Sequence, residues 1–146
     1  MIKRSHPNEP IINAEKPPCF IAIEGPIGVG KSTLTRRLAE SLGYHTLLEK
    51  AEDNPFLERF YANQRHAALS AQLFFLFQRA QQLSDLRQSD MFNQTHIADF
   101  LFQKDPLFAQ ITLDANELEL YKKVYQQVQV DIPTPDLVIY LQAPVK

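Results

Sequence analysis

Residues 19–43 read CFIAIEGPIGVGKSTLTRRLAESLG, and this stretch decides the fold because it predicts a strand, a loop and a helix in succession. The apolar run over 20–23 predicts a buried strand over 19–24, and the motif G-x-x-x-x-G-K-S follows it over 25–32. Apolar residues then recur at every fourth position until Gly43, which predicts an amphipathic helix over 31–42. A glycine-rich loop in this context binds phosphate, because its backbone N–H groups and the helix N-terminus face the anion.

The loop contains the residue types that a bound nucleotide requires. Lys31 can reach the β- and γ-phosphates, and the Ser32 hydroxyl can ligate Mg²⁺. The glycines alone would also suit a simple turn, but the strand before the loop and the helix after it favour phosphate binding. The predicted ATP-binding residues lie in the loop or in the first turn of its helix: Gly25, Gly28, Val29, Gly30, Lys31, Ser32 and Thr33.

Length, charge and cysteine content describe an ordinary globular protein. The 146 residues suffice for about one domain, and a net charge of −2 predicts neither nucleic acid nor a membrane surface as a partner. Cys19 is the only cysteine and cannot form an internal disulfide, and no apolar run suits a membrane span or a signal peptide, so we expect a cytoplasmic protein. Prolines near the start predict a flexible tail over 1–17, followed by one domain over 18–146.

The rest of the chain alternates predicted strands with predicted helices. The helix over 66–87 is apolar on much of its surface, and the run 136–141 is typical of a parallel strand covered on both faces. This alternation predicts an α/β fold with a parallel sheet flanked by helices. The other expected elements are a strand over 45–48, an Asn-capped helix over 54–61, a strand over 95–98 and a helix that begins at 113 and ends before Pro133.

Two carboxylates directly follow predicted strands. Glu49 comes after the second strand, and Asp99 comes after the third. Because the carboxyl ends of parallel strands meet at one edge of a sheet, we expect both side chains beside the phosphate loop. A carboxylate can take the proton of an acceptor hydroxyl while Mg²⁺ and Lys31 neutralise the phosphate charge, so the arrangement suits phosphoryl transfer.

The chain contains the motif I-x-I-E-G-x-I-G-x-G-K-S-T over 21–33, Glu49 and the run Asn-Pro-Phe-Leu over 54–57. In these residues it resembles the deoxynucleoside kinase family, especially its bacterial deoxyadenosine/deoxyguanosine kinase branch. The resemblance implies a P-loop kinase fold that transfers phosphate from ATP to the 5′-hydroxyl of a deoxynucleoside, with a purine preferred, in nucleotide salvage. It implies Glu49 as the general base, Lys31 and Asp99 as further catalytic residues, and Ser32 with Asp99 as the Mg²⁺ ligands.

The same resemblance implies a nucleoside-binding role for the long helix over 66–87. Gln72 would bind the edge of the nucleobase, and Arg79, seven residues later, would face the substrate. Seven residues are close to two helical turns, so both side chains project from one side, with Phe75 between them to pack on a base. Gln and Arg are also common on a solvated helix face, which is the alternative interpretation.

The chain departs from the family after the third strand. Most members carry Asp/Glu-Arg-Ser at this position, whereas Asp99 is followed here by Phe and Leu. Lys104 could supply the missing positive charge, and Asp105 stands where many members have an acidic group for the substrate. Lys-Asp-Pro over 104–106 is equally typical of the start of a solvated helix, and both interpretations are open at this point.

A second departure concerns the end of the chain. Family members continue past the fourth strand into a helix, an arginine-rich lid and a fifth strand, whereas this chain ends at Lys146 and has no arginine after Arg87. We therefore expect a chain truncated before the lid, without the last strand. The resemblance also implies a homodimer that pairs through helices, for which the helix over 66–87 is one candidate.

Two other functions stay open on the sequence. Without a lid arginine the chain could be an ATP-binding module or fragment with little or no turnover. It could also phosphorylate a nucleoside monophosphate or another small metabolite. A monophosphate acceptor requires clustered arginines, and Arg59, Arg65 and Arg79 are the candidates for this role.

Overall fold

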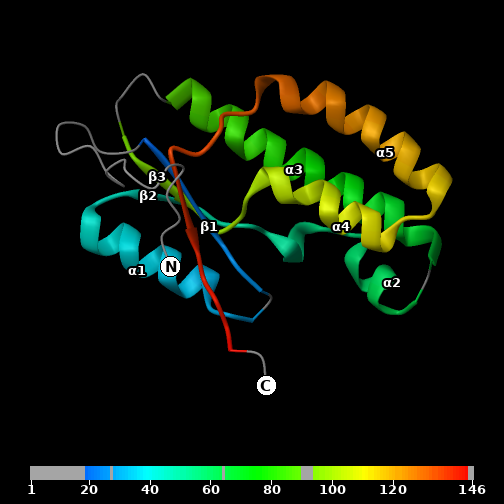
Figure 1. Ribbon diagram of the computed structural model, residues 1–146, viewed down its shortest axis with the longest axis horizontal. Helices are drawn as coiled ribbons and strands as arrows, with labels where there is room; N and C mark the ends of the chain where they lie inside the picture. Colours follow the sequence, from blue (N-terminus) through cyan, green and yellow to red (C-terminus); the bar gives the residue numbers. More distant parts are fainter. Residues whose placement is uncertain (1–18, 27, 64, 90–93, 145–146) are drawn as a thin grey trace. The chain divides into compact units, whose positions relative to one another are not determined.

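A computed structural model describes residues 19–26, 28–63, 65–89 and 94–144 of the chain (Figure 1). The chain divides into two compact units, which are described separately. The sheet unit comprises Met1–Glu49, Leu86–Leu101 and Thr134–Lys146, and the helical unit comprises Lys50–Asp85 and Phe102–Pro133. The tail that the sequence predicts over 1–17 lies outside the described residues.

The described part of the sheet unit contains four parallel strands in the order β2-β3-β1-β4. Ile21 in β1 is paired with Ile97 on one side and Leu137 on the other, which fixes the register of the three strands. Because the strands all run in one direction, the residues that follow them gather at one edge. The strands are β1 (Phe20–Glu24), β2 (His45–Leu47), β3 (His96–Ala98) and β4 (Leu137–Tyr140).

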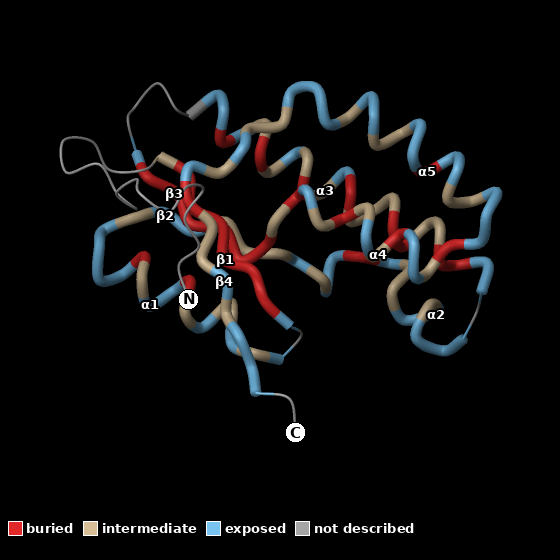
Figure 2. Tube along the Cα trace, viewed as in Figure 1, coloured by how far each residue is buried: buried red, intermediate tan, exposed pale blue. Residues whose placement is uncertain are grey.

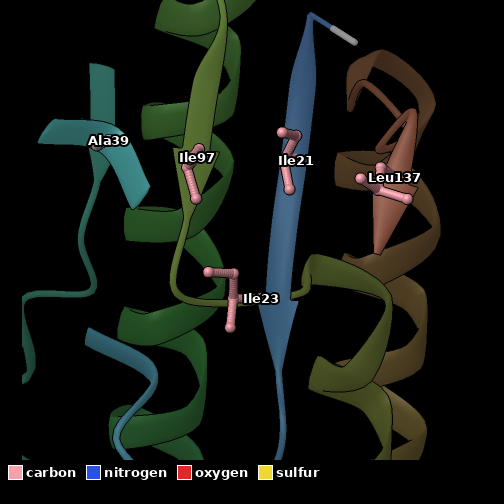
Figure 3. Close-up of a cluster of buried hydrophobic side chains, with 5 residues drawn as sticks. All are labelled: Ile21, Ile23, Ala39, Ile97 and Leu137. Atoms are coloured by element: carbon pink, nitrogen blue, oxygen red, sulfur yellow. The ribbon is translucent and has the colours of Figure 1, made fainter. Parts of the chain in front are cut away.

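The core of the sheet unit forms where alternate residues of β1 meet the neighbouring strands and α1 (Lys31–Leu42). Ile21 and Ile23 lie two residues apart, so they project from the same face of the strand. Figure 3 shows them with Ile97, Leu137 and Ala39 of α1, and all five side chains are buried. Every residue of β1 is buried (Figure 2), which positions the strand firmly just ahead of the loop.

Asp136 ties the beginning of β4 to the beginning of β1. Its Oδ2 accepts hydrogen bonds from the backbone N–H groups of Cys19 and Phe20, both at 2.9 Å. Its own N–H donates to the Phe20 carbonyl at 2.8 Å. These bonds satisfy backbone groups ahead of the first ladder pair and help to hold the two strands in register.

The helical unit is built around α3 (Ala68–Ser89), whose last residues belong to the sheet unit. Figure 1 shows α4 and α5 lying alongside it. A capping box starts α5, with the Asp114 carboxylate accepting from the Glu117 N–H and the Glu117 side chain accepting in return. The other elements here are η1 (Ala51–Asp53), α2 (Leu57–Tyr61), η2 (Arg65–Ala67), η4 (Phe102–Lys104), α4 (Asp105–Thr112), α5 (Ala115–Val128) and η5 (Gln129–Asp131).

Most predicted elements are present, and the first helix has the predicted bounds. The prediction of an Asn-capped helix over 54–61 is wrong at its start, since α2 begins at Leu57. Asn54 Oδ1 accepts from the Phe56 N–H at 3.0 Å, and its Nδ2 donates to the Ala71 carbonyl, also at 3.0 Å. Its side chain therefore closes a short turn and binds α3, so the helix starts later than the local pattern predicts.

The apolar run over 136–141 is typical of a strand covered on both faces, whereas only the start of β4 is buried among the described residues. β4 lies at an edge of the described sheet, and burial falls along it from Leu137, which is buried, to Tyr140, which is 40% exposed. An apolar run predicts a strand, but the sequence pattern does not say which neighbours will cover it. Among the described helices, none is both long and apolar enough to cross a membrane.

Ile23 has no exposed surface. Replacing it by valine leaves a methyl-sized cavity and is expected to lower the free energy of unfolding by about 1 kcal/mol. Ile111→Val makes the same change at a residue that is 81% exposed and is expected to stay within about 0.5 kcal/mol of the parent chain. Urea denaturation of the two variants checks this. Equal losses would contradict the assignment of Ile23 to the core.

Candidate active site

The backbone of the phosphate loop requires glycine at its first position. Gly25 has φ +157°, and a Cβ added there would lie 2.7 Å from the Leu141 carbonyl oxygen. Leu141 cannot easily move away, because its N–H donates to the Glu24 carbonyl at 2.7 Å. Gly30, the N-cap of α1, has φ 96° and accepts from the Leu34 N–H at 3.0 Å. The loop thus turns tightly from β1 into the helix.

Lys31 folds back over its own loop. Its Nζ donates to the Gly25 carbonyl at 3.0 Å and lies 3.6 Å from Glu24 Oε1. The same Oε1 accepts from the Gly25 N–H at 2.7 Å, and Glu24 is only 6% exposed. Glu24 has no role among the residues predicted above, although a carboxylate at the end of an apolar strand directly before the loop is a signal for one. Glu24 orients the loop and its lysine together.

Asp99 connects two other predicted site residues, Ser32 and Glu49, at the carboxyl edge of the sheet. Its Oδ2 accepts from the Ser32 hydroxyl at 2.7 Å, and its Oδ1 accepts from the Glu49 N–H at 2.8 Å. The Asp99 N–H donates to the Leu47 carbonyl at 3.1 Å, which continues the pairing of β2 with β3. The Asp99 carboxylate thus contacts the first turn after the loop, as expected, and the backbone of Glu49 is held beside it; the position of the Glu49 carboxylate at the loop stays a prediction.

The other predicted residues of the loop lie at its surface or partly within it. Gly28 is exposed with φ 78°, and Val29 is half-buried with its N–H donating to the Pro26 carbonyl at 3.3 Å. Thr33 is exposed in the first turn of α1. Gly28, in the loop, and Thr33, in the first turn of α1, are therefore accessible to a ligand from solvent.

A second cluster lies in the helical unit around Asp105, the first residue of α4. Its Oδ1 accepts from Arg79 Nη1, and its Oδ2 accepts from Gln72 Nε2 at 3.2 Å and from the Tyr121 hydroxyl. Asp105 is 1% exposed, so the alternative of a solvated helix start is wrong. The Lys-Asp-Pro run by itself is typical of a solvated helix start. The residues that bury Asp105, Arg79 and Tyr121, are distant in sequence, so the run gives no sign of them.

Gln72 and Arg79 share one side of α3, as their spacing predicts. Both are buried, at 8% and 9% exposed, so the alternative of a solvated helix face is also wrong. The Arg79 guanidinium carbon lies 5.1 Å from the centre of the Phe75 ring, a cation–π geometry. Lys104 instead lies with its Nζ 5.3 Å from the centre of the Phe108 ring. The structure therefore joins Gln72, Phe75, Arg79 and Asp105 in one cluster.

The sequence alone does not predict Tyr121 as a member of this cluster. The structure places it on the buried side of α5, with no exposed surface. Burial raises the pKa of Tyr121 above its ordinary value, and the adjacent Asp105 carboxylate raises it further. Burial and the same carboxylate also raise the pKa of Tyr125. Both phenols stay protonated at neutral pH, so Tyr121 is a hydrogen-bond donor.

Comparison with known proteins identifies the family. The family model for deoxynucleoside kinases matches residues 21–146. The chain belongs to the deoxynucleoside kinase family. It is 43% identical over 127 residues to a deoxyguanosine kinase of Bacillus subtilis, which covers 85% of this chain and 60% of that protein. It is 30% identical over 131 residues to a deoxyadenosine/deoxycytidine kinase of the same organism, with 84% and 59% covered.

Solved structures agree with this assignment. The deoxyadenosine kinase of M. mycoides with bound dATP matches with a TM-score of 0.72 and 29% identity, over 86% of this chain and 65% of that one. The resemblance to deoxynucleoside kinases and the predicted parallel α/β P-loop kinase fold are therefore confirmed. The chain spans about 60% of the length of the two curated relatives described above.

Gly25→Ala is expected to cost about 3 kcal/mol or more of folding free energy, since it adds backbone strain and a clash with the Leu141 carbonyl. Gly43→Ala is the matched control. Gly43 also has a positive φ of 70°, but nothing lies within 4 Å of an added Cβ, so about 1 kcal/mol is expected. Urea denaturation measures both. Similar losses would show that the close approach of Leu141 is unimportant.

A double-mutant cycle on Arg79 and Asp105 should give a coupling free energy of about 2–3 kcal/mol, because each single variant leaves a buried charge without its partner. The variants are Arg79→Met, Asp105→Leu and their combination, measured by chemical denaturation. The cycle on Arg65 and Glu117 is the control. Arg65 is 55% exposed at its side chain, so this pair should couple by at most about 1 kcal/mol. Additive effects at Arg79 and Asp105 would contradict the buried pair.

Proposed function

We propose that this chain binds ATP with Mg²⁺ at the phosphate loop and phosphorylates the 5′-hydroxyl of a purine deoxynucleoside. One observation carries the proposal: the Asp99 carboxylate binds both the loop hydroxyl of Ser32 and the backbone of Glu49. A phosphate-binding loop, a metal-binding oxygen and a candidate base are thereby assembled in one unit. Phosphoryl transfer requires these three parts.

The donor site uses the loop backbone and Lys31. The N–H groups of the loop residues Gly25, Gly28, Val29, Gly30, Lys31, Ser32 and Thr33 would surround the phosphates, with the N-terminus of α1 adding partial positive charge. Lys31 would neutralise charge on the β- and γ-phosphates once its ammonium leaves the Gly25 carbonyl.

Ser32 and Asp99 fit a magnesium ion. Ser32 Oγ and Asp99 Oδ2 are hard oxygen ligands held 2.7 Å apart, which suits an ion that takes few protein ligands and keeps water and phosphate oxygens. When bound, Mg²⁺ neutralises charge on the phosphates and orients them. Among the described residues no group of three or more His, Cys, Asp or Glu suits a metal, so a site shared with substrate phosphate is the form expected here.

Glu49 is proposed as the general base. Its carboxylate would take the proton of the 5′-hydroxyl as the hydroxyl oxygen forms its bond to the γ-phosphorus. The bond between the γ-phosphorus and the bridging oxygen breaks, and ADP leaves with that electron pair. The Glu49 N–H donates to Asp99, and this hydrogen bond fixes the backbone from which the Glu49 side chain projects.

The nucleoside is assigned to the cluster in the helical unit. Gln72 would bind the base edge with its amide, while Asp105 and Arg79 supply an acceptor and a donor, and Phe75 supplies an apolar face. Lys104 is proposed as a further contact. A purine is preferred because the relative that is 43% identical is a deoxyguanosine kinase. Cytoplasmic location, a role in salvage and a homodimer stay predictions.

A nucleoside monophosphate as acceptor has less support. The three arginines available for its phosphate already have other partners. Arg79 binds Asp105, Arg65 binds the Thr112 carbonyl and Glu117, and the Arg59 guanidinium lies over the Phe56 ring. None of these three arginines could therefore bind an acceptor phosphate without giving up or sharing a contact that it already makes.

Glu49→Gln is expected to lower the rate of deoxyguanosine 5′-phosphorylation by about 10²- to 10⁴-fold, the usual contribution of a general base. Nucleoside monophosphate is measured by chromatography, and ATP binding by the rise in melting temperature with ATP and Mg²⁺, which should not change. Glu52→Gln, at an exposed position, is the control and should keep full activity. Full turnover by Glu49→Gln would refute the base assignment. ATP binding by the parent chain without product would favour the ATP-binding module.

A further inference from the structure

Tyr121 is the one member of the Asp105 cluster for which the proposed reaction has no use. It lies in the middle of α5, and its residue has no exposed surface. Its ring stacks on Tyr125 with 6.1 Å between ring centres, and Tyr125 stacks in turn on Phe102 at 5.3 Å. Neighbouring aromatic rings thus hold the hydroxyl in place where it donates to Asp105 Oδ2.

We propose that Tyr121 is a positioning residue for nucleoside recognition, which fixes the Asp105 carboxylate so that Asp105 and Gln72 present a defined edge to the base. The inference rests on the proposed nucleoside site in the helical unit. Tyr121 itself does not touch the nucleoside in this proposal. It acts only through Asp105.

The hydrogen bonds of Asp105 carry the argument. A carboxylate has about four acceptor positions, and the cluster fills three of them. Tyr121 and Gln72 occupy Oδ2, and Arg79 occupies Oδ1. One position on Oδ1 is left for a ligand N–H, and its direction depends on how the carboxylate plane is turned.

Rotation of that plane is what Tyr121 opposes. The terminal torsion of an aspartate is broad, so a carboxylate that is held by flexible partners can turn. Arg79 and Gln72 both come from α3, whereas Tyr121 contacts the group from α5. Donors from two helices restrict the rotation more than donors from one. The Tyr121 hydroxyl also holds Asp105 Oδ2 in place, and this oxygen accepts from the Gln72 amide and so keeps that amide in one orientation.

The raised pKa of Tyr121 is consistent with this role, because a phenol that stays protonated is a permanent donor. Tyr125 provides the internal comparison. It lies one turn later on α5, stacks in the same aromatic group, and makes no hydrogen bond through its hydroxyl to a described residue. Removing that hydroxyl changes the aromatic group without removing a hydrogen bond to Asp105.

The test is calorimetric titration of the full chain with deoxyguanosine and, separately, with ATP and Mg²⁺. Tyr121→Phe keeps the ring and removes the donor, and we expect the Kd for deoxyguanosine to rise about tenfold. The Kd for ATP should stay within about twofold of the parent value, and so should both Kd values of Tyr125→Phe. A purely structural role would instead lower the fraction of folded protein, which reduces the binding stoichiometry for both ligands and leaves each Kd unchanged.

A second pair of variants covers the case in which Tyr121→Phe does not fold. Tyr121→p-aminophenylalanine keeps an N–H donor at the same place and should restore the parent Kd, whereas Tyr121→p-methylphenylalanine has the same size without a donor and should not. An unchanged deoxyguanosine Kd in the variants without a donor overturns the inference. A parent chain that binds ATP but neither deoxyguanosine nor deoxyadenosine overturns the proposed nucleoside site, and this inference with it.

Discussion

The sheet unit depends on one buried carboxylate. Asp99 is 5% exposed, and its two oxygens bind a hydroxyl from the phosphate loop and an N–H from the chain after β2. A buried carboxylate is costly unless donors satisfy it, so those two segments cannot move away without leaving a charge unpaired. The parallel arrangement of the strands makes this possible, because it brings the ends of β2 and β3 to the edge where the loop begins.

The part of the fold that could be predicted is the part that local chemistry determines. The strand, loop and first helix follow from an apolar run, glycines at positive φ and a stop glycine, all within 25 residues of sequence. The predicted helix and α1 have identical bounds for this reason. Spacing along α3 likewise predicted that Gln72 and Arg79 share a side, since helical geometry is regular.

What could not be predicted depends on partners far away in the sequence. Asp105 looks like the first residue of a surface helix, and only Arg79, 26 residues earlier, and Tyr121, 16 residues later, make it a buried anion. Asn54 has the pattern of a helix cap, yet its amide bonds to the Ala71 carbonyl in α3. The same short sequence is compatible with both environments, and tertiary contacts decide between them.

The Asp105 cluster is a poor source of stability for the helices around it. Burying an arginine and an aspartate costs much of what their attraction returns, and apolar side chains of similar size often stabilise a core as well or better. The buried pair is therefore weak evidence for stability, which is compatible with the proposed role of the cluster in binding the nucleoside. The hydroxyl of Tyr121 and the amide of Gln72 satisfy acceptors that would otherwise remain unpaired.

The position of Lys31 has a consequence for the strength of phosphate binding. The Lys31 ammonium already donates a hydrogen bond to the Gly25 carbonyl and faces the Glu24 carboxylate. A phosphate bound at the loop as proposed above would have to displace this internal contact. Its net affinity would therefore be lower than the attraction between the ammonium and the phosphate alone.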